Sequence, residues 1–345
     1  MIRPVIIKVA ISGLLFASTY ASANSPSPAR IFPRFQNDYQ TVFDSVNPEH
    51  LQALLKDMTG VNPVTIGGQT FAITDRYLPA SKEKFRRYFR AYFEALGVPV
   101  QEQAYPTRHN IGETMGHNME AVMRGKSADS IVIIVHYDSM GPRNNPAGNP
   151  GVDDDMTGMA TMLETARILA QYQNRLHYTV RFVASDYEEF PSPRLEGATV
   201  YAHSLRDLAQ KDKFNLIAAI DDEQIGWNCS GPDHKCRMVK PTFNVFSCST
   251  NRRYNYQKLG DQMEAVVQQF APAMAVKRDC IGPNSDHYAM WDIGVPAVVF
   301  SELNPFDNPH FDNEGGDTYD KIDQTYFFSI ARVGVTFAAT VVGIE

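Results

Sequence analysis

The sequence predicts an α/β fold with a mostly parallel central sheet flanked by helices on both faces. Short runs of β-branched and apolar residues, such as residues 131–135, alternate along the chain with segments whose apolar residues recur at helical spacing. A strand that is apolar along its whole length is typical of a sheet covered on both faces. The alternation of strands with helices therefore indicates an α/β/α sandwich.

Five segments have the apolar periodicity of helices. One is expected directly after three consecutive aspartates, and the others span residues 47–57, 77–96, 260–270 and 326–342. Aromatic residues recur at helical spacing in the segment 77–96: Phe85, Tyr88, Phe89, Tyr92 and Phe93. Such an aromatic stripe predicts a face buried in the core rather than a binding site.

The expected strands are short, and most of them lead into polar side chains. They span residues 98–104, 118–123, 131–135, 178–184, 216–220 and 297–300. The third ends at His136 and Asp138, the fourth leads to Glu188 and Glu189, and the fifth leads to Asp221, Asp222 and Glu223. Because ligands bind at the carboxyl ends of the strands in open α/β sheets, this recurrence predicts a site at one edge of the sheet.

Length and charge limit the classes of protein. The chain has 345 residues, 43% of them hydrophobic, and a net charge of -7. We therefore expect one domain over residues 47–345, preceded by a flexible Ser/Pro-rich lead-in over residues 24–46. The sequence pI of about 5.7 argues against nucleic-acid binding. No run of about 20 apolar residues predicts a membrane span in the mature chain, which we expect to be a monomer.

The N-terminus has the features of a secretory signal peptide. Arg3 and Lys8 precede a mostly apolar run at residues 9–17, and small residues follow up to Ala23. The run is too short to span a membrane comfortably, so we favour a signal peptide over residues 1–23 against an uncleaved anchor or a core helix. This predicts a secreted or periplasmic protein.

Export permits disulfide bonds between the four cysteines. Of the three pairings, we favour Cys229–Cys236 with Cys248–Cys280, and four free thiols are the alternative. A cysteine-rich zinc site is not expected, because the chain has no Cys-x-x-Cys pair.

The polar residues at the strand ends suit a metal ion. His136 offers an imidazole nitrogen, and Asp138 is placed to accept the other ring N–H. Imidazole and carboxylate oxygen together suit zinc. Two structural alternatives need no metal. The aspartates at 153–155 would interact favourably with the dipole at a helix N-terminus, and Glu188 and Glu189 would form a solvated acidic turn.

An ordered set of motifs resembles the secreted di-zinc aminopeptidases of the bacterial leucyl aminopeptidase type. That family has His-x-Asp, Gly-Ala-Asp-Asp-Asn-x-Ser-Gly, Glu-Glu, Asp-Met-x-Gly and a late His near Asp-Thr. The chain has His136-Tyr137-Asp138, then the run from Gly151 to Gly158, then Glu188-Glu189. Ser285-Asp286-His287 and Gly294-Val295-Pro296-Ala297 also fit, and the resemblance covers about residue 47 to the C-terminus.

The resemblance implies a zinc exopeptidase-like fold, two Zn²⁺ per chain and a role for each matching residue. Asp153 would bridge the two zincs, and His136 and Glu189 would be terminal ligands. Glu188 would be the general base. A cis peptide bond would join Asp153 to Asp154.

Two positions depart from the family pattern. Glu223 occupies a slot that the family fills with Asp, and Asp221 or Asp222 would replace it if the strand register slipped. In the late histidine slot we favour Asp312 over His310. A second site made only of oxygen ligands would leave manganese or cobalt as alternatives to zinc.

The resemblance therefore implies an aminopeptidase that hydrolyses N-terminal residues from peptides with a free N-terminus. The first alternative is a one-zinc glutaminyl-peptide cyclase, which shares the fold and the run from His136 to Ser139, although its Trp-His-Thr is missing here. The second is a non-catalytic binding domain of the same fold. A serine hydrolase is excluded, because the chain has no Gly-x-Ser-x-Gly elbow.

Overall fold

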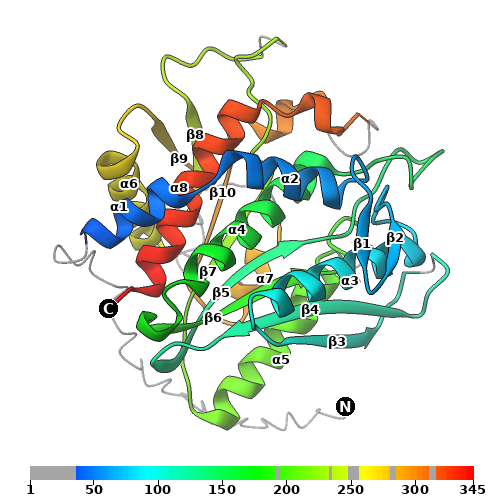
Figure 1. The fold of residues 1–345 in the computed structure, drawn as a ribbon. Helices are drawn as coiled ribbons and strands as arrows, with labels where there is room; N and C mark the ends of the chain where they lie inside the picture. The colour runs from blue at the N-terminus through cyan, green and yellow to red at the C-terminus, as the bar shows by residue number, and fades with distance from the viewer. Residues whose placement is uncertain are drawn as a thin grey trace, which may run out of the picture.

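A mixed eight-stranded sheet forms the centre of the molecule (Figure 1). The computed structural model describes residues 36–109, 111–190, 194–232, 235–247, 256–279, 285–310 and 316–345. The strand order is β3-β4-β6-β5-β7-β10-β8-β9. Its strands are β3 (Val100–Pro106), β4 (Met115–Met123), β5 (Ser127–His136), β6 (Tyr178–Ser185), β7 (Leu216–Asp222), β8 (Thr242–Phe246), β9 (Ala275–Asp279) and β10 (Ala297–Glu302).

The middle of the sheet is parallel. β5 pairs in parallel with both β6 and β7, and β7 pairs in parallel with β10. The antiparallel pairings join β3 to β4, β4 to β6 and β10 to β8. A separate antiparallel hairpin joins β1 (Val64–Ile66) to β2 (Gln69–Phe71). The predicted α/β class with a mostly parallel sheet is therefore confirmed.

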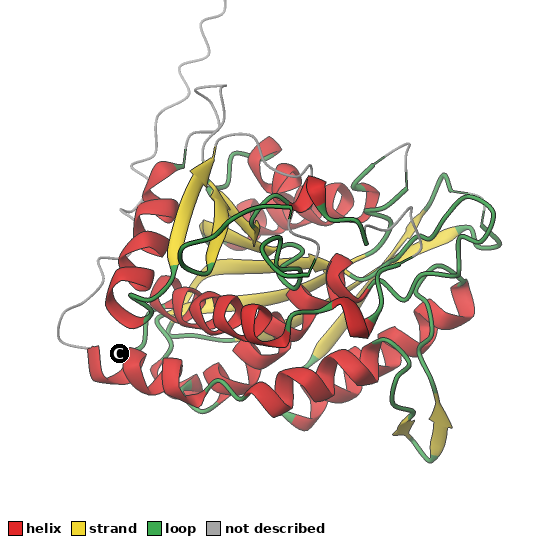
Figure 2. Ribbon diagram, turned by 90° about the horizontal axis from the view of Figure 1, so that it is seen from above, coloured by secondary structure: helices red, strands yellow, loops and turns green. Residues whose placement is uncertain are grey.

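Helices cover both faces of the sheet, as Figure 2 shows. The helices are α1 (Gln36–Ser45), α2 (Pro48–Met58), α3 (Pro79–Ala95), α4 (Gly158–Ala170), α5 (Glu196–Asp212), α6 (Gln257–Phe270), α7 (His287–Asp292) and α8 (Gln324–Val342). Successive side chains of β5 point to opposite faces of the sheet and pack into two different cores. Ile131, Ile133 and Val135 pack into a large core with α3, α4 and α8, whereas Val132 and Ile134 pack into a smaller core with α5 and α7.

The predicted flexible lead-in is wrong for residues 36–45, which form α1. Tyr39 and Val42 of this helix are buried, and α1 packs along α8. The Arg332 side chain on α8 donates to the carbonyl oxygen of Phe43 and lies over its ring. Polar residues separate these buried residues along the sequence, so the average composition of the segment does not reveal its apolar face. The predicted signal peptide lies outside the described residues.

One helix among the described residues, α8, is long and apolar enough to cross a membrane, but 78% of its most apolar stretch is buried. It contacts α1, α4 and α6, so it is a core helix of the domain.

The predicted Cys229–Cys236 disulfide is present. Cys248 and Cys280 lie outside the described residues.

Hydrogen bonds to a buried glutamate, Glu164, fasten α2 to α4. Asn47 caps α2 by accepting from the N–H of His50, and its own N–H donates to Glu164 on α4. The Glu164 carboxylate also binds the side chains of His50 and Arg167. Burial alone would raise the pKa of Glu164, but the hydrogen bonds from Arg167, His50 and the Asn47 N–H lower it to about 2.

We expect Glu164→Gln to lower the free energy of unfolding by about 2–3 kcal/mol at pH 7. The folded state holds the Glu164 carboxylate ionised, so this stabilisation is present above the ordinary pKa of 4.5 and is lost as pH falls towards 2. Urea denaturation at pH 7 and pH 3 would show a difference from wild type that shrinks at the lower pH. Glu94→Gln, at an exposed position on α3, is the matched control, and a variant as stable as wild type at pH 7 would contradict the expectation.

Candidate active site and metal centre

The candidate site lies at the carboxyl ends of β5, β6 and β7. His136 is the last residue of β5, Glu188 and Glu189 follow β6, and Glu223 follows β7 directly. All four side chains are buried, with between 0% and 8% of their residue surface exposed. The sequence prediction that these strand ends meet at one edge of the sheet is consistent with this arrangement.

Three side chains form a close group: His136, Asp154 and Glu223. The His136 Nε2 atom lies 3.0 Å from Asp154 Oδ1 and 3.8 Å from Glu223 Oε1. One donor atom of each residue lies within 4.8 Å of the other two. An imidazole and two carboxylates facing one point form the donor set that zinc takes in proteins, so these residues fit a divalent cation.

Asp153, predicted to bridge two metals, is not a member of the close group, and the next residue, Asp154, lies beside His136 in its place. The Asp153 carboxylate accepts instead from the N–H of Gly226 at 2.7 Å and from the Asn308 side chain at 3.0 Å. The cis peptide bond likewise joins Asp154 to Asp155 and not Asp153 to Asp154. Neighbouring side chains point in different directions, so a shift of one residue decides which carboxylate faces the histidine.

The backbone around Asp154 is held by donors and acceptors far away in the sequence. The Asp317 carboxylate accepts from the N–H groups of both Asp153 and Asp154, at 2.7 and 2.9 Å. The Gln224 side chain donates to Asp154 Oδ2 at 2.6 Å. Asp155 accepts from the N–H of Gly158, the first residue of α4. The sequence predicted no role for Asp317 or Gln224. The one available signal was the family's Asp-Thr pair, which Asp317-Thr318 matches.

Glu223 is the residue of its strand end that reaches the group. Its Oε2 atom accepts from the Ser285 hydroxyl at 2.6 Å, and its N–H donates to the carbonyl oxygen of Phe300. Asp221 instead accepts from the N–H of His287 and contacts its ring nitrogen, both at 3.0 Å. Asp221 is therefore not placed to substitute for Glu223, and Asp222 is absent from the close group.

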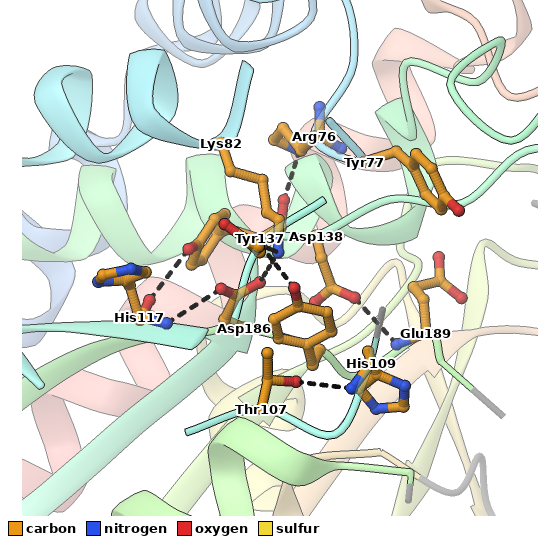
Figure 3. A network of polar contacts seen from close by, with 12 residues as sticks. Arg76, Tyr77, Lys82, Thr107, His109, His117, Tyr137, Asp138, Asp186 and Glu189 are labelled. Atoms are coloured by element: carbon orange, nitrogen blue, oxygen red, sulfur yellow. Dashed lines mark hydrogen bonds and ion pairs between the residues drawn. The ribbon is translucent and has the colours of Figure 1, made fainter. Parts of the chain in front are cut away.

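Asp138 lies beside His136, as predicted, and it also makes contacts that the sequence did not predict. Its backbone carbonyl oxygen lies 3.2 Å from His136 Nδ1, whereas the nearest carboxylate oxygen lies 3.7 Å from that nitrogen, beyond hydrogen-bonding distance. The carboxylate also accepts from the N–H groups of Glu188 and Glu189, at 3.0 and 3.1 Å. Figure 3 shows the contact with Glu189. Asp138 thus fixes the turn that carries both glutamates.

A buried lysine, Lys82, stabilises the turn that carries Glu188 and Glu189. The Lys82 ammonium lies 2.5 Å from Glu113 and 2.9 Å from Asp186, and 3.6 Å from the centre of the Tyr187 ring. The other oxygen of Asp186 accepts from the N–H of His117, as Figure 3 shows. Tyr187 has a φ of 64°, a conformation unusual for this residue type, and its hydroxyl donates to Glu113. These contacts hold the backbone immediately before Glu188.

Glu188 is a buried carboxyl among other acids. Burial raises its pKa well above the ordinary value; His136 opposes this effect, and Glu223 and Asp286 add to it. The nearest basic group in an ion pair with it is the Arg194 guanidinium, 3.6 Å from Oε1. Glu189 is buried on the same turn but is not a member of the close group.

The late ligand slot is described only in part. Asp312, the favoured residue, lies outside the described residues. The alternative, His310, donates its N–H to the Asn308 side chain and lines a cavity with Trp227 and Asp323. His310 is not a member of the close group around His136.

Fold and donor set together define a metallopeptidase of the α/β/α type. The model of peptidase family M28 matches residues 118–338, and the chain belongs to this family. It is 26% identical to a probable leucine aminopeptidase of Arthroderma benhamiae, over 77% of this chain and 73% of the relative. It is 24% identical to a probable zinc metalloprotease of Pyricularia oryzae, over 93% of this chain and 70% of the relative.

Two solved structures show the same fold. The LapA aminopeptidase of Legionella pneumophila has a TM-score of 0.68 at 16% identity, covering 94% of this chain and 79% of that one. A glutaminyl cyclase of Macrostomum lignano has a TM-score of 0.69 at 14% identity, covering 92% and 96%. The comparisons confirm the predicted family resemblance and the predicted enzyme class, a metallo-aminopeptidase.

We expect Lys82→Met to lower the free energy of unfolding by about 3–5 kcal/mol, because it leaves Glu113 and Asp186 buried without a cation. The double variant Lys82→Met/Asp186→Asn should recover part of that loss, since one of the two carboxylates is then removed. Lys84→Met, on the same helix but half-buried, serves as the control. Thermal and urea denaturation would test this, and a single variant as stable as wild type would contradict it.

Proposed function

We propose that the protein is an exported, zinc-dependent aminopeptidase that removes N-terminal residues from peptides. The observation that carries the proposal is the buried group of His136, Asp154 and Glu223 beside the Glu188 carboxylate. In this proposal Asp154 would be a ligand of both zincs, and His136 and Glu223 would be ligands beside it. Glu189 and Asp312 keep the ligand roles that the family resemblance implies, which completes a site for two zincs.

The residues of the chain supply proton transfer and orientation. When bound, the zincs would polarise the scissile carbonyl and make the attacking water more acidic. Glu188 accepts the proton of that water and donates it to the leaving nitrogen. Asp138 keeps Glu188 at a fixed angle through the two backbone N–H groups. The surrounding carboxylates favour a substrate with a free, protonated N-terminus.

Export and a monomeric state remain part of the proposal. The Cys229–Cys236 disulfide supports an oxidising compartment, in agreement with the predicted signal peptide. The mature enzyme is then secreted or periplasmic, without a membrane anchor, and acts on peptides rather than nucleic acids.

A one-zinc glutaminyl cyclase is the second candidate. It is favoured by the structural likeness to the Macrostomum lignano enzyme and by the sequence from His136 to Ser139. The aminopeptidase is better supported, because the curated relatives are aminopeptidases and metalloproteases.

Glu188→Gln should lower kcat for aminoacyl-anilides by about 10²–10⁴-fold, because it removes the base without altering side-chain size. Zinc content, measured by mass spectrometry, should stay at about two per chain, and chelation should abolish the wild-type activity. Glu94→Gln is the control. One zinc with cyclisation of N-terminal glutamine would indicate the cyclase, and neither metal nor turnover would indicate a non-catalytic binding domain.

Asp154→Asn should reduce the zinc content of the purified protein, because its carboxylate faces His136. Asp153→Asn should keep the zinc, while weakening the contacts to Gly226 and Asn308 and lowering the melting temperature. Each variant is the other's control. Loss of zinc from Asp153→Asn alone would restore the original assignment of the bridging residue.

A further inference from the structure

Arg194 is a half-exposed cation at the candidate active site. It lies just before α5, its Nη2 atom is 3.6 Å from Glu188 Oε1, and 51% of its side-chain surface is exposed. That distance is longer than a hydrogen bond, so the contact with Glu188 does not engage the planar donor fork of the guanidinium in a bidentate pair. No feature of the proposed reaction uses this residue.

Two buried cations near the site, among the described residues, are already occupied by the protein itself. Arg76 is fully buried and donates to the carbonyl oxygens of Tyr137, Pro150 and Gly151. Lys82 is also fully buried and is paired with Glu113 and Asp186. Of these three cations, Arg194 is therefore the one that a substrate can reach.

The position of Arg194 relative to Glu188 defines which part of a substrate it can meet. In the proposed reaction Glu188 donates a proton to the leaving nitrogen, which must lie about 3 Å from its carboxylate. In a dipeptide, the α-carboxylate carbon is separated from that nitrogen by the N–Cα and Cα–C bonds, of about 1.5 Å each. A guanidinium in contact with Glu188 is thus within reach of a carboxylate on the residue that follows the scissile bond.

We propose that Arg194 binds the carboxylate of the residue after the scissile bond, and that the enzyme therefore prefers dipeptides to longer or amidated peptides. A guanidinium fork matches a carboxylate in a bidentate pair, which gives the preference its chemical basis. The inference rests on the proposed aminopeptidase function. An acidic side chain at the same substrate position offers the same chemistry as an α-carboxylate, and the test separates the two sources.

The test compares three substrates that share the N-terminal residue X that the anilide panel favours: X-Gly, X-Gly-amide and X-Asp-amide. Wild type should have a kcat/KM at least tenfold higher for X-Gly than for X-Gly-amide. Arg194→Met should reduce this ratio to within about twofold of one, mainly through a higher KM for X-Gly. Arg194→Lys should keep an intermediate ratio, because it retains the charge without the planar fork.

Arg206→Met is the matched control, since Arg206 is a similarly exposed arginine on α5 that pairs with Asp207. It should keep the wild-type ratio. A wild-type preference for X-Asp-amide over X-Gly-amide that Arg194→Met removes would assign the acidic side chain as a second source of the carboxylate.

Three results would overturn the inference. A wild-type ratio near one would show that the carboxylate is not bound. An equal loss on X-Gly and X-Gly-amide in Arg194→Met, with an altered pH profile of kcat, would show that Arg194 acts only on Glu188. Absence of turnover of every anilide and peptide by wild type would overturn the proposed function and the inference together, whereas anilide turnover with either of the first two results would overturn the inference alone.

Discussion

The Asp138 carboxylate accepts hydrogen bonds from the N–H groups of Glu188 and Glu189, and the candidate site depends on this contact. It joins the end of β5 to the turn after β6, so that His136 and the two glutamates become parts of one rigid unit. Hydrogen bonds to an ionised acceptor are the stronger kind, and here both partners are buried. The Lys82–Asp186 pair holds the same turn from the other side. The proposed base is thus oriented by backbone and side-chain contacts that do not involve the substrate.

The site gathers many buried carboxylates, and each ionised group is costly there unless it is compensated. The protein compensates several of them with neutral donors. Two backbone N–H groups bind Asp317, the Ser285 hydroxyl binds Glu223, and the Gln224 amide binds Asp154. These donors leave one side of Asp154 and Glu223 directed at His136, which is where the proposed divalent cation would balance the charge. In that proposal, burial and metal binding are two aspects of one arrangement.

Most of the fold could be predicted from periodicity, because the central strands are apolar on both faces and the helices have one apolar face. The strand ends also predicted where His136, Glu188 and Glu223 would meet. Three points could not be predicted. In a run of three aspartates, side-chain identity does not reveal which residue faces the histidine, since the backbone of residues 152–157 departs from a regular helix at Asp154 and Asp155. The pairing of Asp138 with backbone N–H groups leaves no trace in the sequence, and α1 is stabilised by α8, some 290 residues away.

The glutamate at position 223 illustrates how a longer side chain fits a slot that the family fills with aspartate. Lengthening the side chain by one methylene would move its carboxylate unless the backbone and the carboxylate were both held. Here the N–H of Glu223 donates to the carbonyl oxygen of Phe300 on β10. Its Oε2 atom accepts from the hydroxyl of Ser285, two residues before α7. Asp221 is meanwhile bound to His287, whose pKa burial lowers to about 3, so that the imidazole is neutral at physiological pH and does not attract the site's carboxylates by charge. The Ser285-Asp286-His287 segment therefore selects Glu223, rather than its acidic neighbours, as the residue that reaches His136.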